Sequence, residues 1–194
     1  MRKILFATHN KSKVSELIQL TDTYLEILTL ADLNYIQEIP ETGKTLEENA
    51  LQKAKTVYNT FHIPCFSDDS GLFIDNLNGE PGVNSAHYSG NRDHGQNNKL
   101  VVDKLHGVSN RNAYFKTIFC LVLSPNEYHF FEGIVHGNIA TEPKGTGGFG
   151  YDPIFIPEGY SSTFGELDSK LKAQLSHRAK ATQKLIKFLG ESYE

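Results

Sequence analysis

Several features that define large classes of protein are absent or rare in this chain of 194 residues. No stretch approaches the roughly 18 consecutive apolar residues of a membrane-spanning helix, and the apolar run near the N-terminus is too short for a signal peptide. The net charge is −4, so no overall basic field favours nucleic acid. We therefore expect a cytoplasmic protein with neither a membrane nor a nucleic-acid partner.

Cysteine is also scarce. The two cysteines, Cys65 and Cys120, each lie in an apolar run and neither belongs to a CxxC pair. Buried free thiols are the expected state, rather than a disulfide or a zinc site. Repeats, low-complexity tracts and linkers are lacking as well, and the hydrophobic fraction of 39% is ordinary for a folded chain. We predict one domain over residues 1–194.

The hydrophobic patterns predict an α/β fold. A short buried strand at 3–8 runs through a polar turn into a helix with Val14, Leu17 and Ile18 at helical spacing. Later predicted elements are a strand within 24–33, a helix at 96–107 with Leu100, Val101 and Leu105 inward, β-rich runs at 113–123 and 127–140, a glycine-dense loop at 144–157, and a terminal helix with Ser176 as N-cap and Gly190 as stop.

The clearest predicted helix lies within residues 41–64. Thr45 followed by Glu48 fits a capping box, and an apolar face follows at Leu46, Ala50, Ala54 and Val57. Lys53 falls on that same face. Its long stem either carries the ammonium group to the rim or aims it inward at an anion.

The stretch CFSDDSGLFID, residues 65–75, places two adjacent carboxylates among apolar residues. Buried charges are costly unless they are paired or bind a cation. Either the strand ends at a solvated polar turn at 69–71, or a site here uses negative charge. If the strand continues, Asp68 and Asp69 face opposite sides. A metal pair would then join one of them to a carboxylate such as Glu41, and oxygen-only ligation suits Mg²⁺.

Three further segments are candidates for ligand contacts. THNKSK, residues 8–13, lies where a helix N-terminus attracts phosphate, although the P-loop pattern is missing and capping by Asn10 or Ser12 is the alternative. In GTGGFGYDP, residues 145–153, Phe149 lies between glycines, suited to stacking on a base or simply at a hairpin tip. In SHR, residues 176–178, a histidine and an arginine occupy a helix start, which is electrostatically unfavourable for both.

Taken in order, the segments THNKSK, ETGKTLEENALQKA, SDDSGL, NGEPGVNSAHYSG, GGFGYDPIF and SHR resemble the inosine triphosphate/xanthosine triphosphate pyrophosphatase family. The resemblance reaches from residue 3 to residue 178. It implies an elongated two-lobed α/β fold with a central mixed β-sheet flanked by helices and a substrate cleft between the lobes. It also implies Mg²⁺-dependent hydrolysis of ITP, dITP and XTP to the monophosphate and pyrophosphate, by a homodimer.

The resemblance also implies the roles of individual residues. Asp69 would be the general base and, with Glu41, a metal ligand; Lys53 would be catalytic, and Asp68 would support Asp69. Phe149 would stack on the base, while His177 and Arg178 would read the 6-oxo group. The substrate-binding residues would be Thr8, His9, Asn10, Lys11, Ser12, Lys13, Ser70, Phe149, Gly150, Tyr151, Asp152, Lys172, His177 and Arg178.

Small departures from the family pattern occur at His9, which replaces a small or amide residue, and in the strand at 113–123, which lacks the more common arginine-rich start. Three rival functions remain. They are a sanitising enzyme for modified pyrimidine nucleotides, a nucleotide-binding regulator without catalysis, and a nucleic-acid-binding module. The SHR and GGFGYDP segments argue against the first, the presence of Asp69, Glu41 and Lys53 against the second, and the net charge against the third.

Overall fold

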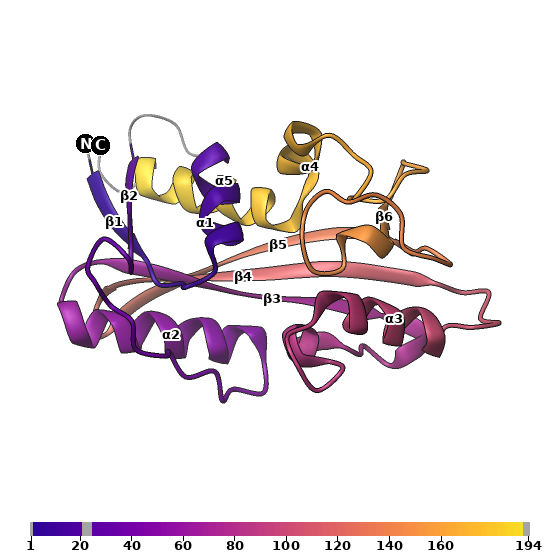
Figure 1. Cartoon of the computed structure of the whole chain (residues 1–194). Helices are drawn as coiled ribbons and strands as arrows, with labels where there is room; N and C mark the ends of the chain where they lie inside the picture. Colours follow the sequence, from indigo (N-terminus) through magenta and orange to yellow (C-terminus); the bar gives the residue numbers. More distant parts are fainter. Residues whose placement is uncertain (1, 21–24, 192–194) are drawn as a thin grey trace. The chain divides into compact units, whose positions relative to one another are not determined.

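The computed structural model describes residues 2–20 and 25–191 (Figure 1). The chain forms two compact units, each assembled from separate stretches of sequence. The first unit contains Met1–Asp69, Thr117–Gly133 and Arg178–Glu194, and the second contains Ser70–Lys116 and Ile134–His177. The expectation of a single domain over 1–194 stays a prediction.

A six-stranded sheet has the strand order β2-β1-β3-β4-β5-β6. Strand β1 is parallel to β2 and to β3, whereas β5 is antiparallel to β6. Two residues join β4 to β5, which makes these strands a hairpin. The sheet is therefore mixed, as predicted. The strands are β1 (Arg2–Phe6), β2 (Leu25–Thr29), β3 (Cys65–Ile74), β4 (Asn112–Ser124), β5 (Glu127–Ile139) and β6 (Phe155–Pro157).

In the first unit, helices α1 (Lys11–Leu20) and α5 (His177–Glu191) lie on one face of the sheet and α2 (Leu46–Phe61) lies on the other (Figure 1). The predicted inward face of α1 is only half right. Leu17 is buried in the core, but Ile18 is 56% exposed. The predicted stop at Gly190 is wrong, because α5 continues to Glu191.

The predicted α2 is confirmed in detail. Its four apolar positions, from Leu46 to Val57, are all buried. The Thr45 side chain accepts from the backbone N–H of Glu48 at 3.1 Å. The reciprocal half of the capping box is shifted by one residue, because the Glu48 carboxylate accepts from the N–H of Lys44 at 2.6 Å.

The second unit has helices α3 (His94–Lys104) and α4 (Ser169–Leu175) and the short 3₁₀ turns η1 (Asp75–Leu77), η2 (Gly82–His87) and η3 (Asp152–Ile154). Its core contains Val101 and Leu105 of α3, as predicted. Leu100, predicted inward, is only half-buried, and the buried neighbours are Asn97 and Asn98.

Strand β3 is continuous from Cys65 to Ile74, so the alternative of a polar turn at 69–71 is wrong. Gly71 lies within this strand, where an added Cβ would collide with the carbonyl oxygen of Gly82. The close approach of another backbone segment thus accounts for the glycine without any turn.

Cys65 and Cys120 are free and buried, as predicted. Burial raises the pKa of each thiol to about 12, so neither is a reactive thiolate at neutral pH. Across the described ranges 2–20 and 25–191, no helix is both long and apolar enough to cross a membrane.

Candidate active site

The turn before α1 is fixed by its own polar side chains. The Asn10 side-chain oxygen accepts from the backbone N–H groups of Ser12 at 3.0 Å and Lys13 at 3.2 Å. The Thr8 hydroxyl oxygen accepts from the N–H of Asn10 at 3.2 Å. The capping alternative is therefore confirmed for Asn10. It leaves the Lys13 side chain directed away from the turn, into the interior of the unit.

Lys13 ends in a buried cluster of charges around Asp68. Its ammonium nitrogen lies 2.9 Å from the Asp68 carboxylate, and Arg178 Nη2 lies 3.4 Å from the same oxygen. The Arg178 guanidinium also donates to Glu16 of α1. Burial raises the pKa of Asp68, but the cations Lys13, Arg178 and Lys53 outweigh burial and hold it well below its ordinary value. The charged form of Asp68 is therefore favoured between the half-buried Lys13 and the buried Arg178.

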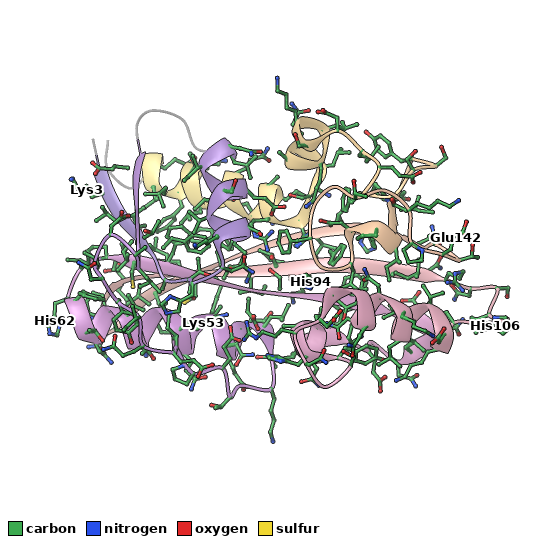
Figure 2. All side chains as sticks on the ribbon, in the orientation of Figure 1. Lys3, Lys53, His62, His94, His106 and Glu142 are labelled. Atoms are coloured by element: carbon green, nitrogen blue, oxygen red, sulfur yellow. The ribbon has the colours of Figure 1, made fainter. Side chains whose placement is uncertain are left out.

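A second cluster forms around Asp69 and α2. One Asp69 oxygen accepts from the side-chain N–H of Asn49 at 3.1 Å, and the other lies 3.2 Å from the Lys53 ammonium nitrogen. Lys53, labelled in Figure 2, also donates to Glu41. Its side chain is only 7% exposed, so it points inward at anions rather than along the rim. The inward alternative for Lys53 is confirmed.

The two aspartates differ in electrostatics as well as in direction. Burial raises the pKa of Asp69, and the nearby Glu41 carboxylate adds to this, so that the cations Lys53 and Lys13 do not cancel the rise. Burial lowers the pKa of Lys53, but the surrounding carboxylates outweigh burial and raise it above its ordinary value. Asp69 is thus the carboxylate better able to accept a proton, next to an ammonium group that stays charged.

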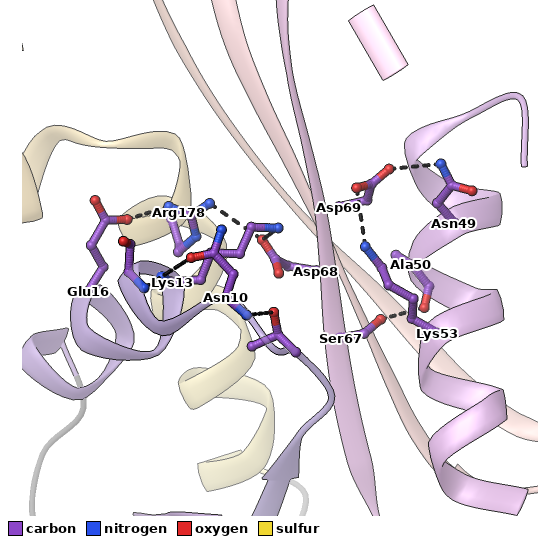
Figure 3. A network of polar contacts seen from close by, with 12 residues as sticks. Asn10, Lys13, Glu16, Asn49, Ala50, Lys53, Ser67, Asp68, Asp69 and Arg178 are labelled. Atoms are coloured by element: carbon purple, nitrogen blue, oxygen red, sulfur yellow. Dashed lines mark hydrogen bonds and ion pairs between the residues drawn. The ribbon is translucent and has the colours of Figure 1, made fainter. Parts of the chain in front are cut away.

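Figure 3 shows Asp68 and Asp69 on opposite sides of β3, one directed toward α1 and α5 and the other toward α2. This is the outcome that strand alternation predicts, and it excludes a side-by-side pair of carboxylates. The binding of one metal ion by Glu41 and Asp69 together remains a prediction. The two carboxylates do contact the same ammonium group, that of Lys53.

Those two carboxylates are suitable ligands for a divalent cation. Within the described part of the chain, no three or more His, Cys, Asp or Glu side chains gather into a metal site. Mg²⁺ does not require such a cage, because it takes one or two protein carboxylates and completes its shell with water and phosphate oxygens. Glu41 and Asp69 supply two such carboxylates, which their shared contact with Lys53 Nζ brings together.

Three other residues of the predicted phosphate-binding turn line a cavity of the first unit. Thr8, His9 and Lys11 line a cavity of about 730 Å³ between α1 and the segment 29–36. The His9 ring stacks on Tyr35 with the ring centroids 6.1 Å apart. Its Nε2 lies 2.8 Å from the Gln37 carbonyl oxygen. The structure therefore directs His9 toward its own unit's 35–37 segment.

In the second unit, the glycine-rich loop is held in a defined shape around Asp152. One Asp152 oxygen accepts from the backbone N–H of Phe149 at 2.6 Å and from the Lys172 ammonium at 2.7 Å. The same ammonium lies 5.1 Å from the centroid of the Phe149 ring. Gly148 has φ +72°, and a Cβ there would collide with Asp152. Three predicted residues, Phe149, Asp152 and Lys172, therefore belong to one cluster.

The remaining predicted residues lie in separate surroundings. His177 of the second unit is 7% exposed and stacks on Phe115 with the ring centroids 4.7 Å apart. Ser70 is half-buried on β3. Base reading by Arg178 stays a prediction, and in the first unit its guanidinium contacts two carboxylates.

Sequence reasoning missed Glu16 and Asn49. Asn49 was visible as a polar residue one position before the buried Ala50 of α2, and it is itself 3% exposed. Glu16 carries no comparable signal, because it contacts a residue 162 positions away. Each missed residue orients a charged group, Asn49 at Asp69 and Glu16 at Arg178.

Comparison with known proteins gives matches along nearly the whole chain. A model of the Ham1 family matches residues 4–188. A dITP/XTP pyrophosphatase of Flavobacterium psychrophilum is 44% identical, covering 96% of this chain and 98% of its own. The dITP/XTP pyrophosphatase of Bacillus subtilis is 42% identical, covering 97% and 98%. The structure of a HAM1 protein from Coxiella burnetii has a TM-score of 0.90 at 35% identity, over 98% of this chain and 100% of that one.

Proposed function

Because this chain belongs to the Ham1 family, we propose that it hydrolyses the non-standard purine nucleoside triphosphates ITP, dITP and XTP to the monophosphate and pyrophosphate. The observation that carries this proposal is the convergence of Asp69 and Glu41 on one buried ammonium group, that of Lys53. Such a group of charges suits the hydrolysis of a phosphoanhydride, in which negative charge must be neutralised and a water activated.

Asp69 is the general base of this reaction. Burial raises its pKa above that of an ordinary aspartate, which makes it the stronger base, and the bond from Asn49 fixes its orientation. Asp69 takes a proton from a water molecule as the water oxygen bonds to the α-phosphorus. The bond from that phosphorus to the bridging oxygen breaks, and pyrophosphate leaves with the bonding electron pair. Lys53, still protonated, offsets the negative charge that collects on the phosphates.

We propose that Glu41 and Asp69 would hold a divalent cation, Mg²⁺. When bound, the cation would supply positive charge to offset that of the phosphates and of the leaving pyrophosphate. The phosphate chain also meets the N-terminus of α1, where the Asn10 cap fixes the turn. Lys13 supplies a further positive charge at that end of α1, held in place by Asp68.

The base is bound by residues of the second unit. Phe149 stacks on the purine, with Lys172 and Asp152 fixing the loop behind it. His177 donates to the 6-oxo group. ATP would present an amine donor instead of that acceptor, and leaving a buried donor unpaired is an effective way to reject an analogue. GTP shares the 6-oxo group, so we propose that its 2-amino group is excluded by shape or polarity.

A substrate panel tests the proposal. ITP, dITP, XTP, ATP and GTP are each incubated with the protein, with and without Mg²⁺, and pyrophosphate and orthophosphate are measured separately. We expect pyrophosphate from the first three nucleotides, with slow turnover of ATP and GTP and little turnover without the metal. Equal turnover of ATP and ITP would refute the specificity. Activity that is unaffected by chelation would refute the metal site.

We also propose that the active form is a cytoplasmic homodimer. The free, buried state of both cysteines is consistent with a reducing compartment. Light scattering coupled to gel filtration tests the assembly. A dimer gives twice the chain mass of 21.7 kDa, and a species at the chain mass under assay conditions would contradict the proposal.

A further inference from the structure

Helix α3 buries two adjacent asparagines beside the apolar positions predicted for it. Asn97 and Asn98 are 1% and 5% exposed. Both polar atoms of the Asn97 side-chain amide form hydrogen bonds. The oxygen accepts from the N–H of Ser89 at 2.7 Å, and the nitrogen donates to the Ala86 carbonyl at 3.2 Å. Asn97 therefore ties α3 to the end of η2.

Asn98 is used differently. Its side-chain N–H donates to the carbonyl oxygen of Gly150 at 3.1 Å, across 52 positions of sequence. Its side-chain oxygen is buried and has no hydrogen-bond partner among residues 2–20 and 25–191. A buried acceptor without a partner is unfavourable for folding, so packing alone would favour an apolar side chain at this position. The bond to Gly150 is the contribution that an apolar residue could not make.

Gly150 is the second residue of the four-residue loop Phe149–Asp152, and its neighbours are also held by hydrogen bonds. The Tyr151 hydroxyl donates to the Ser85 carbonyl of η2 at 2.8 Å. Asp152 accepts from the backbone of Phe149 and from Lys172. Gly150 has φ +64°, in the left-handed region that glycine adopts readily because it has no Cβ. The same lack of a side chain leaves its backbone free to adopt other conformations. The bond from Asn98 supplies the restraint that the residue itself lacks.

We propose that Asn98 is a positioning residue for base recognition: by holding the Gly150 carbonyl, it fixes the Gly150–Tyr151 peptide and, through the adjoining Gly150 residue, the Phe149 ring that stacks on the purine. This inference rests on the proposed function, because it assumes that the Phe149–Asp152 loop binds the base. Asn98 acts through the loop and contacts no phosphate group in this account, so its effect belongs to recognition of the base alone.

The test compares a nucleotide with an inhibitor that has no base. KM and kcat for ITP are measured together with the inhibition constant of inorganic tripolyphosphate. Asn98→Leu removes the bond to Gly150 while keeping the side-chain size. We expect KM for ITP to rise about threefold to tenfold, the range expected for one lost hydrogen bond, with kcat within about twofold. The inhibition constant of tripolyphosphate should be unchanged.

Asn97→Leu is the matched control, since it removes a buried amide of the same helix that does not contact the loop. It leaves Ser89 N–H and the Ala86 carbonyl unpaired, so we expect a larger loss of thermal stability than for Asn98→Leu, with KM for ITP unchanged. Asn98→Asp, which keeps the shape but removes the donor, gives the same kinetic comparison if the leucine variant does not fold.

Unchanged KM for ITP in a folded Asn98 variant would overturn the inference while leaving the proposed function intact. An equal rise in KM and in the tripolyphosphate constant would also overturn it, because general loosening would then explain both. Wild-type protein that neither hydrolyses nor binds ITP in calorimetry would overturn the proposed function, and the inference with it.

Discussion

Asp68 and Asp69 are neighbours in sequence, yet substitution by asparagine should have different effects at the two positions. At Asp68 it should lower the stability of the protein, and at Asp69 it should abolish activity with little change in stability. Asp68 is fully buried and ion-paired to Lys13 at 2.9 Å and to Arg178 at 3.4 Å. Asp68→Asn keeps the side-chain shape and removes the charge, so the half-buried Lys13 and the buried Arg178 lose a shared counter-ion. Breaking a buried pair in this way costs about 3–5 kcal/mol. For a chain of this size that is a drop of roughly 10 °C in the unfolding temperature.

Asp69→Asn should have little effect on stability. Burial already disfavours the charged form of Asp69, as its raised pKa indicates, and Lys53 keeps its contact with Glu41. We expect a change within about 1 kcal/mol in the free energy of unfolding. Hydrolysis of ITP should nevertheless be almost abolished, because the general base is gone.

The pH dependence distinguishes the two carboxylates further. The pKa of Asp68 is lowered on folding, so its stabilisation is present above the ordinary aspartate pKa and is lost as the pH falls below it. The pKa of Asp69 is raised on folding, so its contribution is present at low pH and is lost as the pH rises through the folded-state pKa. Relative to wild type, the Asp69→Asn protein should therefore gain stability with rising pH.

Urea unfolding followed by circular dichroism, at several pH values from acidic to neutral, measures both variants against wild type. Equal destabilisation by the two substitutions would refute the assignment of distinct electrostatic roles. So would a stable Asp68→Asn protein, because Lys13 and Arg178 would then have tolerated the loss of their shared partner.

Three further substitutions test the supports of the site. Gly148 has φ +72°, and a Cβ at this position would collide with Asp152. Gly148→Ala should therefore displace the Phe149–Asp152 loop and raise KM for ITP by about tenfold, and unchanged kinetics would refute this. Arg111→Met removes donors to the carbonyls of Leu105, Ile139 and Ala140, so the free energy of unfolding should fall by about 3 kcal/mol in urea titration, and no change in the midpoint would contradict this. Thr45→Ala removes the α2 cap and should cost about 1 kcal/mol by the same titration, whereas an unchanged midpoint would show that the cap is dispensable.

The sequence predicted most securely those features that local periodicity determines. The apolar face of α2 and its Thr45 cap depend on residues three or four positions apart, and both are present. The division of Asp68 from Asp69 follows from strand alternation alone, once β3 is continuous. The sequence does not decide whether the strand is continuous, because SDDSG is equally typical of a turn.

Contacts between distant residues could not be predicted in this way. The Lys53 stem suits either the rim or the interior, and only the positions of Glu41 and Asp69 decide between them. Glu16 pairs with Arg178 from the opposite end of the chain, and no local pattern marks it. Asn98 interrupts the apolar face of α3, which makes it look like a surface residue until its bond to Gly150 is seen.

Hydrolysis of ITP in ¹⁸O-labelled water, with the products separated by mass spectrometry, tests the central claim most directly. If Asp69 activates water for attack on the α-phosphorus, the label is expected in inosine monophosphate, and the released pyrophosphate is unlabelled. Label in pyrophosphate, or release of labelled orthophosphate with inosine diphosphate, would contradict the account.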